Sequence, residues 1–275
     1  MAVDSNYLIG RDGLKLYYRY WIPENPTKVV CLIHGHGEHS GRYSKLASYL
    51  MECGIATYCI DMRGHGKSEG KKGHAKNMDI LLSDIEELLK AARVQHLQPP
   101  LFLFGHSMGG NLVANFMISK DSKEISGFIL SSPWIKLKFS PPAWKVKISL
   151  LIGALWPAFT AGTGLDASKI SRIKSEVEKY IEDPLVHDKL SVALYKTIME
   201  GGENALLKAA DIKKSGLVYH GTADEIIDHK ASEQLANSND KLEWKAIEGA
   251  YHEPHNDEGR EEIYKLVGDW LSKNQ

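Results

Sequence analysis

The chain has 275 residues, 43% of them apolar, which is enough to bury one large core. Its formal net charge is −1, so electrostatics gives no case for binding nucleic acid or a strongly anionic membrane. The longest apolar run, residues 148–159, is well short of the roughly 20 residues that a membrane-spanning helix needs.

The first part of the chain alternates between strand and helix patterns. Two β-rich runs at 7–10 and 14–21 flank Asp12-Gly13, which predicts a hairpin. Continuous apolar runs predict buried strands at 28–33, 55–60, 101–104 and 127–131. Apolar residues spaced three and four apart predict helices at 43–52, 78–92 and 111–119. Such alternation is typical of a parallel sheet that helices cover on both faces.

The alternation is interrupted at Pro133. From there to about Lys208 the pattern is helical or irregular, with no convincing strand. Strand patterns return at 217–220 and 242–247, and helices are predicted at 230–236 and 261–271. We therefore predict an α/β core, residues 1–132 and 209–275, built on a mostly parallel, doubly wound sheet. A helical cap, residues 133–208, is inserted into it.

A serine occupies the boundary between a predicted strand and a predicted helix, in the segment Gly105-His106-Ser107-Met108-Gly109-Gly110. A serine hydroxyl is a poor nucleophile, so an enzyme that uses one supplies a base and donors for the oxyanion. A sharp strand–turn–helix would lift Ser107 clear of the sheet and aim the amide of Met108 at the developing charge. Because the pattern Gly-x-Ser-x-Gly is weak by itself, its context decides whether Ser107 is a nucleophile.

An acid and a histidine follow two later strands. Open parallel sheets bind their ligands at the carboxyl ends of the strands. Asp224 comes shortly after the strand at 217–220, and His252 shortly after the strand at 242–247. The order Ser107, Asp224, His252 predicts that His252 takes the proton of the serine while Asp224 orients the imidazole. Weaker alternatives are Asp228, which we expect to begin a helix, His229 and His255.

Residues 34–39 contain three histidines and a glutamate. A metal site is the less favoured interpretation, because two glycines prevent the helix that would place histidines one turn apart. We expect instead a loop whose backbone amide at His36 joins that of Met108 in an oxyanion hole.

Four segments of the chain together resemble the monoglyceride lipases of the α/β-hydrolase superfamily. They are His34-Gly35-x-Gly37-Glu38-His39-Ser40-Gly41-Arg42-Tyr43, Asp61-x-Arg63-Gly64-His65-Gly66-x-Ser68, Gly105-His106-Ser107-Met108-Gly109-Gly110 and Gly249-Ala250-Tyr251-His252. They extend over nearly the whole chain. The resemblance implies the α/β-hydrolase fold, a Ser107–Asp224–His252 triad and an oxyanion hole from His36 and Met108.

The resemblance also implies a pocket for a glycerol head group and a cap that meets lipid. The residues that match the family's glycerol pocket are Glu38, Arg42, Tyr180 and His255. We expect part of the apolar stretch at 144–159 to stay exposed and to lie in the lipid interface. The chain departs from several relatives at His36, where they have a small or apolar residue, but only the backbone is expected to act there.

We predict hydrolysis of long-chain monoacylglycerols to fatty acid and glycerol through an acyl-enzyme, with no metal and no organic cofactor. The rate should fall as the pH drops through about 6–7, where the base protonates. A lysophospholipase or a general carboxylesterase would use the same machinery, and a receptor or an acyltransferase of this fold is a further alternative. Residues 1–10 show no apolar leader, so we expect a cytoplasmic protein that is not secreted, which leaves peripheral contact with membranes or lipid droplets open.

Overall fold

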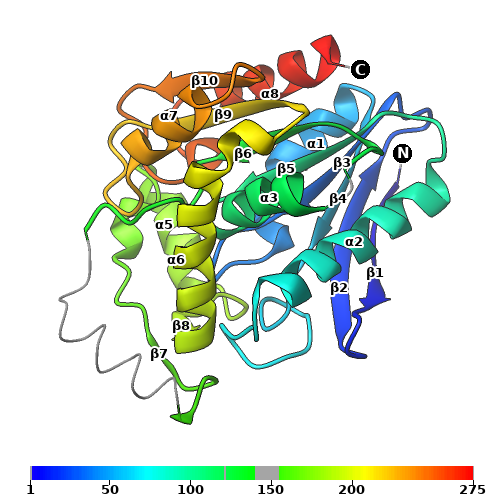
Figure 1. Ribbon diagram of the computed structural model, residues 1–275. Coiled ribbons are helices and arrows are strands. Elements are labelled where there is room, and N and C mark those ends of the chain that lie inside the picture. The colour runs from blue at the N-terminus through cyan, green and yellow to red at the C-terminus, as the bar shows by residue number, and fades with distance from the viewer. Residues whose placement is uncertain (1, 121, 140–154, 275) are drawn as a thin grey trace.

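Eight strands form one sheet in the order β1-β2-β4-β3-β5-β6-β9-β10 (Figure 1). The computed structural model describes residues 2–120, 122–139 and 155–274. The predicted hairpin is present: β1 (Ala2–Ile9) pairs antiparallel with β2 (Lys15–Ile22), and β2 also runs antiparallel to β4. The remaining strands run parallel, as predicted: β3 (Lys28–Ile33), β4 (Ile55–Ile60), β5 (Leu101–His106), β6 (Ile125–Ser131), β9 (Ser215–Gly221) and β10 (Leu242–Ile247).

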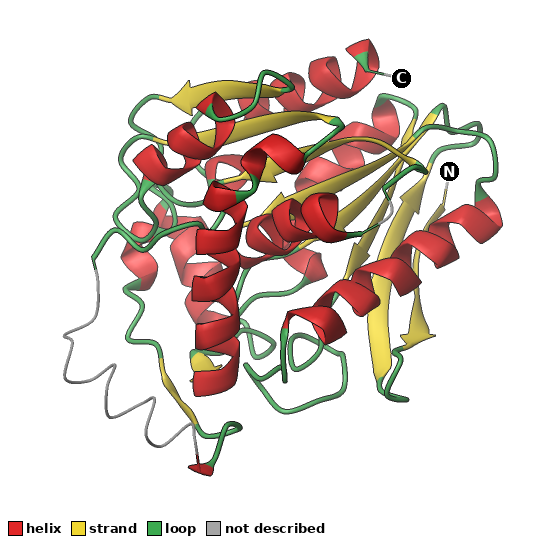
Figure 2. Ribbon diagram, in the orientation of Figure 1, coloured by secondary structure: helices red, strands yellow, loops and turns green. Residues whose placement is uncertain are grey.

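Helices cover both faces of this sheet (Figure 2). One face carries α1 (Ser44–Glu52) and α8 (Arg260–Lys273), whose apolar side chains share one buried cluster. The other face carries α2 (Met78–Gln95), α3 (Met108–Ser119) and α7 (His229–Asn237), whose apolar side chains share a second. The predicted architecture, a mostly parallel sheet with helices on both sides, is confirmed. Among the described residues, no helix has both the length and the apolar composition to cross a membrane.

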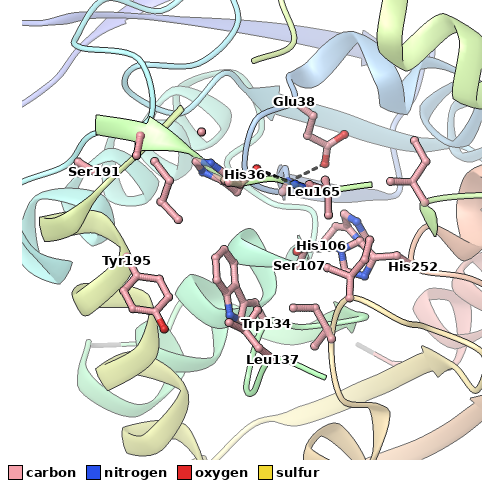
Figure 3. A pocket seen from close by; sticks show the side chains of 18 of the residues that line it. His36, Glu38, His106, Ser107, Trp134, Leu137, Leu165, Ser191, Tyr195 and His252 are labelled. Atoms are coloured by element: carbon pink, nitrogen blue, oxygen red, sulfur yellow. Dashed lines mark hydrogen bonds between the residues drawn. The ribbon is translucent and has the colours of Figure 1, made fainter. Parts of the chain in front are cut away.

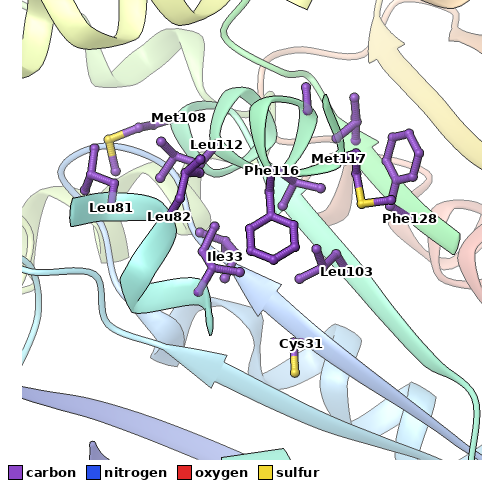
Figure 4. Close-up of a cluster of buried hydrophobic side chains, with 14 of the residues drawn as sticks. Cys31, Ile33, Leu81, Leu82, Leu103, Met108, Leu112, Phe116, Met117 and Phe128 are labelled. Atoms are coloured by element: carbon purple, nitrogen blue, oxygen red, sulfur yellow. The ribbon is translucent and has the colours of Figure 1, made fainter. Parts of the chain in front are cut away.

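The layer between the sheet and helices α2 and α3 is filled with aliphatic and aromatic side chains (Figure 4). Leu82 of α2 and Leu112 and Phe116 of α3 lie in one cluster with Ile33 of β3 and Leu103 of β5, and each is at most 3% exposed. Burying one such side chain stabilises the fold by about 1.5–3 kcal/mol. This packing holds α3, and with it the turn that carries the candidate nucleophile, firmly against the sheet.

Between β6 and β9 the chain leaves the sheet, and the elements of this segment lie together on the left of Figure 1. They include β7 (Thr160–Gly162), α5 (Lys174–Glu182), β8 (Lys189–Ser191) and α6 (Val192–Leu207). The expectation that this segment contains no strand was wrong, because β7 and β8 pair antiparallel. Strands of three residues are too short to show an alternating pattern. Most of the apolar stretch at 144–159 lies outside the described residues, and the extent of a cap at 133–208 stays a prediction.

Buried asparagines attach α6 to the helix that follows the candidate nucleophile. The side-chain amide of Asn111 in α3 donates to the carbonyl oxygens of Trp134, at 2.8 Å, and Ile198, at 2.9 Å. The amide of Asn115, one turn later, donates to the carbonyl oxygen of Gly201 at 3.0 Å. Hydrogen bonds inside the protein are costly to leave unmade. These contacts therefore fix α6 beside the site.

The loops after β3, β5, β9 and β10 meet at one edge of the sheet. Because β3, β5, β6, β9 and β10 are consecutive neighbours and all parallel, their carboxyl ends point the same way. This edge is where open α/β sheets bind ligands. It holds the segment 34–39, Ser107, Asp224 and His252, which are far apart in the sequence.

Candidate active site

Ser107 occupies the turn between β5 and α3, in a backbone conformation that residues other than glycine seldom adopt. Its φ is 51° and its ψ is −114°, and its amide donates to the carbonyl oxygen of Ser131 at 3.0 Å. A Cβ on Gly105 would collide with the backbone of Gly109, and one on Gly109 would collide with the carbonyl oxygen of Ile33. Glycine at both positions therefore permits the sharp strand–turn–helix that the sequence pattern predicts.

The side chain of His252 lies between those of Ser107 and Asp224 (Figure 3 shows His252 beside Ser107). Its Nε2 is 3.0 Å from Ser107 Oγ, and its Nδ1 is 2.6 Å from Asp224 Oδ2. An ionised carboxylate can only accept, so Nδ1 carries the proton and Nε2 of the neutral ring faces the hydroxyl. This arrangement allows His252 to take the proton of Ser107.

The electrostatics of the pair favours an ionised acid beside a basic imidazole. Burial by itself would lower the pKa of His252, but the Asp224 carboxylate outweighs it, and the pKa is raised above its ordinary value. Burial would likewise raise the pKa of Asp224, but its histidine partners hold it well below its ordinary value. At neutral pH Asp224 is therefore an anion that stabilises positive charge on His252.

Asp224 has a donor for each of its four acceptor positions. Oδ1 accepts from the amides of Ile226, at 2.7 Å, and Ile227, at 2.9 Å. Oδ2 accepts from His252 and from a second histidine, His220, whose Nε2 is 2.8 Å away. Sequence reasoning missed His220, because a histidine inside a buried strand looks like any other core position. The spacing His220-Gly221-x-x-Asp224 at a strand end is the signal that could have drawn attention to it.

Of the two backbone positions expected to form the oxyanion hole, Met108 directly follows Ser107 and His36 lines the same cavity. Met108 is the first residue of α3, and the first amides of a helix have no partner within it. His36 follows Gly35 at the end of β3, where a Cβ on Gly35 would lie 3.2 Å from the Cβ of Ser107. Their role as oxyanion donors stays a prediction.

A cavity of about 420 Å³ opens beside Ser107 and His252. Most of its lining is apolar, and Figure 3 shows Trp134, Leu137 and Tyr195 across from Glu38. Its apolar lining residues are Trp134, Leu137, Phe159, Leu165, Ile170, Leu190, Val192, Ile226 and Ile227. Its polar lining residues include Glu38, Tyr180 and Glu253, and Glu253 directly follows His252 in the sequence. The cavity therefore suits a ligand with a long apolar part and a small polar part.

The polar residues of this cavity belong to a buried ionic network. Glu38 accepts from the amide of Gly35 at 2.7 Å, from the hydroxyl of Tyr43 at 2.6 Å and from Arg42 Nε at 3.0 Å. Arg42 also pairs with Glu253. Its guanidinium carbon lies 4.7 Å from the ring centre of Tyr180, which comes from α5. The network thus joins the loop after β3, the loop after β10 and the inserted segment.

The structure does not bring all four expected glycerol-pocket residues to the cavity wall. Glu38 and Tyr180 line the cavity, whereas Arg42 and His255 are not among its lining residues. Arg42 lies behind the two carboxylates that it pairs with. His255 is 1% exposed, and its ring stacks on that of Tyr43 at 4.8 Å. The missed residue is Glu253, which lines the cavity and directly follows His252.

The histidines of residues 34–39 have separate partners. His34 Nδ1 lies 2.6 Å from the carbonyl oxygen of Gly35, and its Nε2 accepts from the amide of Met62 at 2.9 Å. His39 Nε2 lies 2.8 Å from Asp183 of the inserted segment. Among the residues that the structure describes, one group of three has atoms close enough to hold a metal ion, namely His220, Asp224 and His252. Those atoms are already hydrogen-bonded to one another.

The weaker alternatives for the acid and base lie elsewhere. Asp228 begins α7, as expected, and its carboxylate accepts from the amide of Lys230 at 3.1 Å. The ring of His229 lies 6.4 Å from that of His220, and His229 has no hydrogen bond to Asp224 or to Ser107 in the described part of the chain. Asp224 and His252 are therefore the pair that the geometry connects to Ser107.

Three comparisons relate the chain to known proteins. The family model described as serine aminopeptidase, S33 (Hydrolase_4) matches residues 24–259. An uncharacterized abhydrolase domain-containing protein of Dictyostelium discoideum is 33% identical over 99% of this chain, which spans 29% of that protein's length. A monoacylglycerol lipase of Mycolicibacterium smegmatis is 30% identical, over 95% of this chain and 94% of the length of that lipase. The crystal structure of a monoacylglycerol lipase from Paleococcus ferrophilus has a TM-score of 0.84 and 35% identity, covering 93% of this chain and 98% of that one.

Proposed function

This chain belongs to the family described as serine aminopeptidase, S33 (Hydrolase_4). From its site and from its similarity to monoacylglycerol lipases, we propose that it cleaves long-chain monoacylglycerols to fatty acid and glycerol. The observation that carries the proposal is the hydrogen bond of 3.0 Å between Ser107 Oγ and His252 Nε2 at the wall of a largely apolar cavity. The similarity over almost the whole length to proteins named monoacylglycerol lipases supports this substrate class.

In the proposed reaction Ser107 is the nucleophile. As its Oγ attacks the ester carbonyl, His252 Nε2 takes the hydroxyl proton and then gives it to the departing glycerol oxygen. Asp224, held as an anion, stabilises the imidazolium in between. Water, activated by the same His252, then releases the fatty acid from the acyl-enzyme. The amides of His36 and Met108 would stabilise the oxyanion, each by about 3–4 kcal/mol.

The apolar part of the cavity would hold the acyl chain. The inserted segment supplies apolar surface from Leu137, Phe159, Leu165 and Leu190, and the loop after β9 supplies Ile227. Each methylene moved from water into such surroundings contributes about 0.8 kcal/mol. Long acyl chains are therefore expected to bind more tightly than short ones.

The polar part of the cavity would hold the glycerol hydroxyls. The carboxylates of Glu38 and Glu253 and the hydroxyl of Tyr180 are hydrogen-bonding groups within it. The cation of Arg42 is already flanked by both carboxylates, so it is not free to receive a phosphate. This charge arrangement favours an uncharged diol over the phosphate-bearing head of a lysophospholipid.

Peripheral contact with a lipid surface is the second part of the proposal. Leu155 and Trp156 of the inserted segment are 91% and 60% exposed, and Phe159, three residues further, lines the cavity. Large apolar side chains exposed beside an apolar cavity are typical of surfaces that contact lipid. Lipid esters could then pass from such a surface to Ser107.

A head-group panel tests the substrate assignment. The purified chain would be assayed with monooleoylglycerol, dioleoylglycerol and oleoyl lysophosphatidylcholine, with Ser107→Ala as the inactive control. The proposal expects the highest kcat/KM for the monoacylglycerol, because a site that pairs with hydroxyl groups disfavours analogues that lack them. An equal or higher kcat/KM for the lysophospholipid would support a lysophospholipase instead. Labelling of Ser107 by a fluorophosphonate without turnover of any ester would support a receptor.

A further inference from the structure

Two histidines, not one, donate to the same oxygen of the candidate acid. Asp224 Oδ2 is 2.6 Å from His252 Nδ1 and 2.8 Å from His220 Nε2. His220 lies on β9, four residues before Asp224, and both side chains are fully buried. The proposed reaction uses His252 and leaves His220 without a role.

The hydrogen bonds define which nitrogen of His220 carries the proton. The Asp224 carboxylate only accepts, so Nε2 of His220 is the protonated nitrogen. Its Nδ1 lies 2.8 Å from the hydroxyl of Ser232 in α7. In a neutral ring Nδ1 is a bare acceptor, and the Ser232 hydroxyl donates to it. The Asp224 carboxylate thereby sets the tautomer of His220, and the Ser232 hydroxyl satisfies its remaining nitrogen.

His220 is suited to remain uncharged. Burial lowers its pKa, and this effect outweighs the attraction of the Asp224 carboxylate. A second cation beside Asp224 would neutralise the charge that is needed to stabilise the imidazolium of His252. A neutral donor fixes the carboxylate in place without cancelling its charge.

We propose that His220 is a positioning residue that holds Oδ2 of Asp224 toward His252, with Ser232 anchoring its other ring nitrogen. The inference rests on the proposed Ser107–His252–Asp224 chemistry. The amides of Ile226 and Ile227 hold Oδ1, and His220 is the side chain besides His252 that holds Oδ2. Without it, the carboxylate would have His252 as its single side-chain partner.

The effect on His252 has a definite sign. When His220 is removed, Oδ2 is no longer held toward the imidazolium, so the carboxylate stabilises the imidazolium less and the pKa of His252 should fall. The other groups that act on His252 are Glu253 and His255 on its own loop, Glu38 from the loop after β3, and the neighbouring ring of His106 at 5.0 Å. All of them stay in place when His220 is replaced.

The experiment follows the reaction of Ser107 with a fluorophosphonate across pH in the full chain, a reaction that needs no turnover of a lipid. The variants are His220→Leu, His220→Gln, which keeps an amide donor at similar reach, and Ser232→Ala. His229→Leu is the matched control, because His229 is the neighbouring histidine without a bond to Asp224. Circular dichroism and thermal unfolding verify that each variant is folded.

We expect the plateau rate of His220→Leu to fall at least tenfold, about the effect of one hydrogen bond to a charged group, and its acid limb to move to lower pH. His220→Gln should restore most of the rate and the wild-type limb. The plateau rate and the acid limb of Ser232→Ala should shift in the same direction as those of His220→Leu, but less. Both should match the wild type in His229→Leu. A folded His220→Leu with an unmoved acid limb would overturn the inference, as would equal losses in the leucine and glutamine variants.

The two proposals can fail separately. If the wild type labels at Ser107 but hydrolyses no monoacylglycerol, the substrate assignment fails and the role of His220 is still decided by the labelling rates. If the wild type turns over monoacylglycerol and His220→Leu is labelled with the same rate and pH dependence as the wild type, the role of His220 fails and the function stands. Absence of labelling at Ser107 in the wild type would overturn both.

Discussion

Arg42 and Glu253 form a buried ion pair beside the candidate base, although 211 residues separate them in the sequence. Their side chains are 7% and 3% exposed. A buried ion pair is stable when further hydrogen bonds satisfy both partners. Arg42 also donates a hydrogen bond to Glu38, and the side-chain amide of Asn256 donates one to Glu253 at 2.9 Å. The polar end of the cavity and the loop that carries His252 are therefore one connected unit.

Replacing Glu253 by glutamine should weaken binding of the glycerol head and change the pH dependence. We expect the KM for monooleoylglycerol to rise about tenfold, since one charged hydrogen-bonding group is lost from the cavity. Glu253 also raises the pKa of His252, so the acid limb should move to lower pH. Glu258→Gln, an exposed glutamate of the same loop, is the control. Unchanged KM and acid limb in Glu253→Gln would contradict this role.

The pH profile of kcat/KM should have an acid limb set by His252. The neutral ring is the active form, and Asp224 raises the pKa of His252 above its ordinary value of 6.5. A raised pKa keeps the ring protonated to higher pH, so half of the activity should be lost at a pH above 6.5. Steady-state assays at constant ionic strength would measure it. A profile that stays flat down to about pH 5 would exclude His252 as the base.

Asp224→Asn should nearly abolish turnover while Asp228→Asn should not. An amide at position 224 can no longer accept from both histidines and loses the charge that stabilises the imidazolium. By analogy with other serine hydrolases, kcat should fall about 10³–10⁴-fold. Asp228 caps α7, a role that asparagine fills equally well. Assays of both variants decide between the two acids, and a larger loss in Asp228→Asn would reverse the assignment.

Gly109→Ala should destabilise the protein because of a collision, not because of backbone conformation. The added methyl group would meet the carbonyl oxygen of Ile33, which cannot move without disturbing β3. We expect the free energy of unfolding to fall by about 3 kcal/mol. At Gly13, whose φ is +87° and which has open space around it, alanine should cost only about 1 kcal/mol. Urea unfolding compares the two, and equal costs would contradict the steric explanation.

The sheet and the order of the candidate triad could be predicted because both follow from local patterns. Buried parallel strands appear as apolar runs, and topology places the ends of those strands at one edge, where Ser107, Asp224 and His252 are found. The glycines around Ser107 likewise carry a local signal. These features need no knowledge of long-range side-chain contacts.

Contacts between distant segments could not be predicted in this way. The pairing of Arg42 with Glu253 depends on how two loops meet, and nothing in either loop reveals the other. His255 looked like a residue facing the substrate, but the ring of Tyr43 covers it. His220 is hidden inside an apolar strand, where its polar partners are not evident from its neighbours.

The most direct test of the account is to find the acyl group on the enzyme. The chain would be quenched with acid during turnover of monooleoylglycerol, digested, and examined by mass spectrometry beside Ser107→Ala. We predict that the peptide containing Ser107 gains the mass of the oleoyl group minus one hydrogen, and that Ser107→Ala neither gains it nor releases glycerol. Undiminished glycerol release by Ser107→Ala would contradict the account.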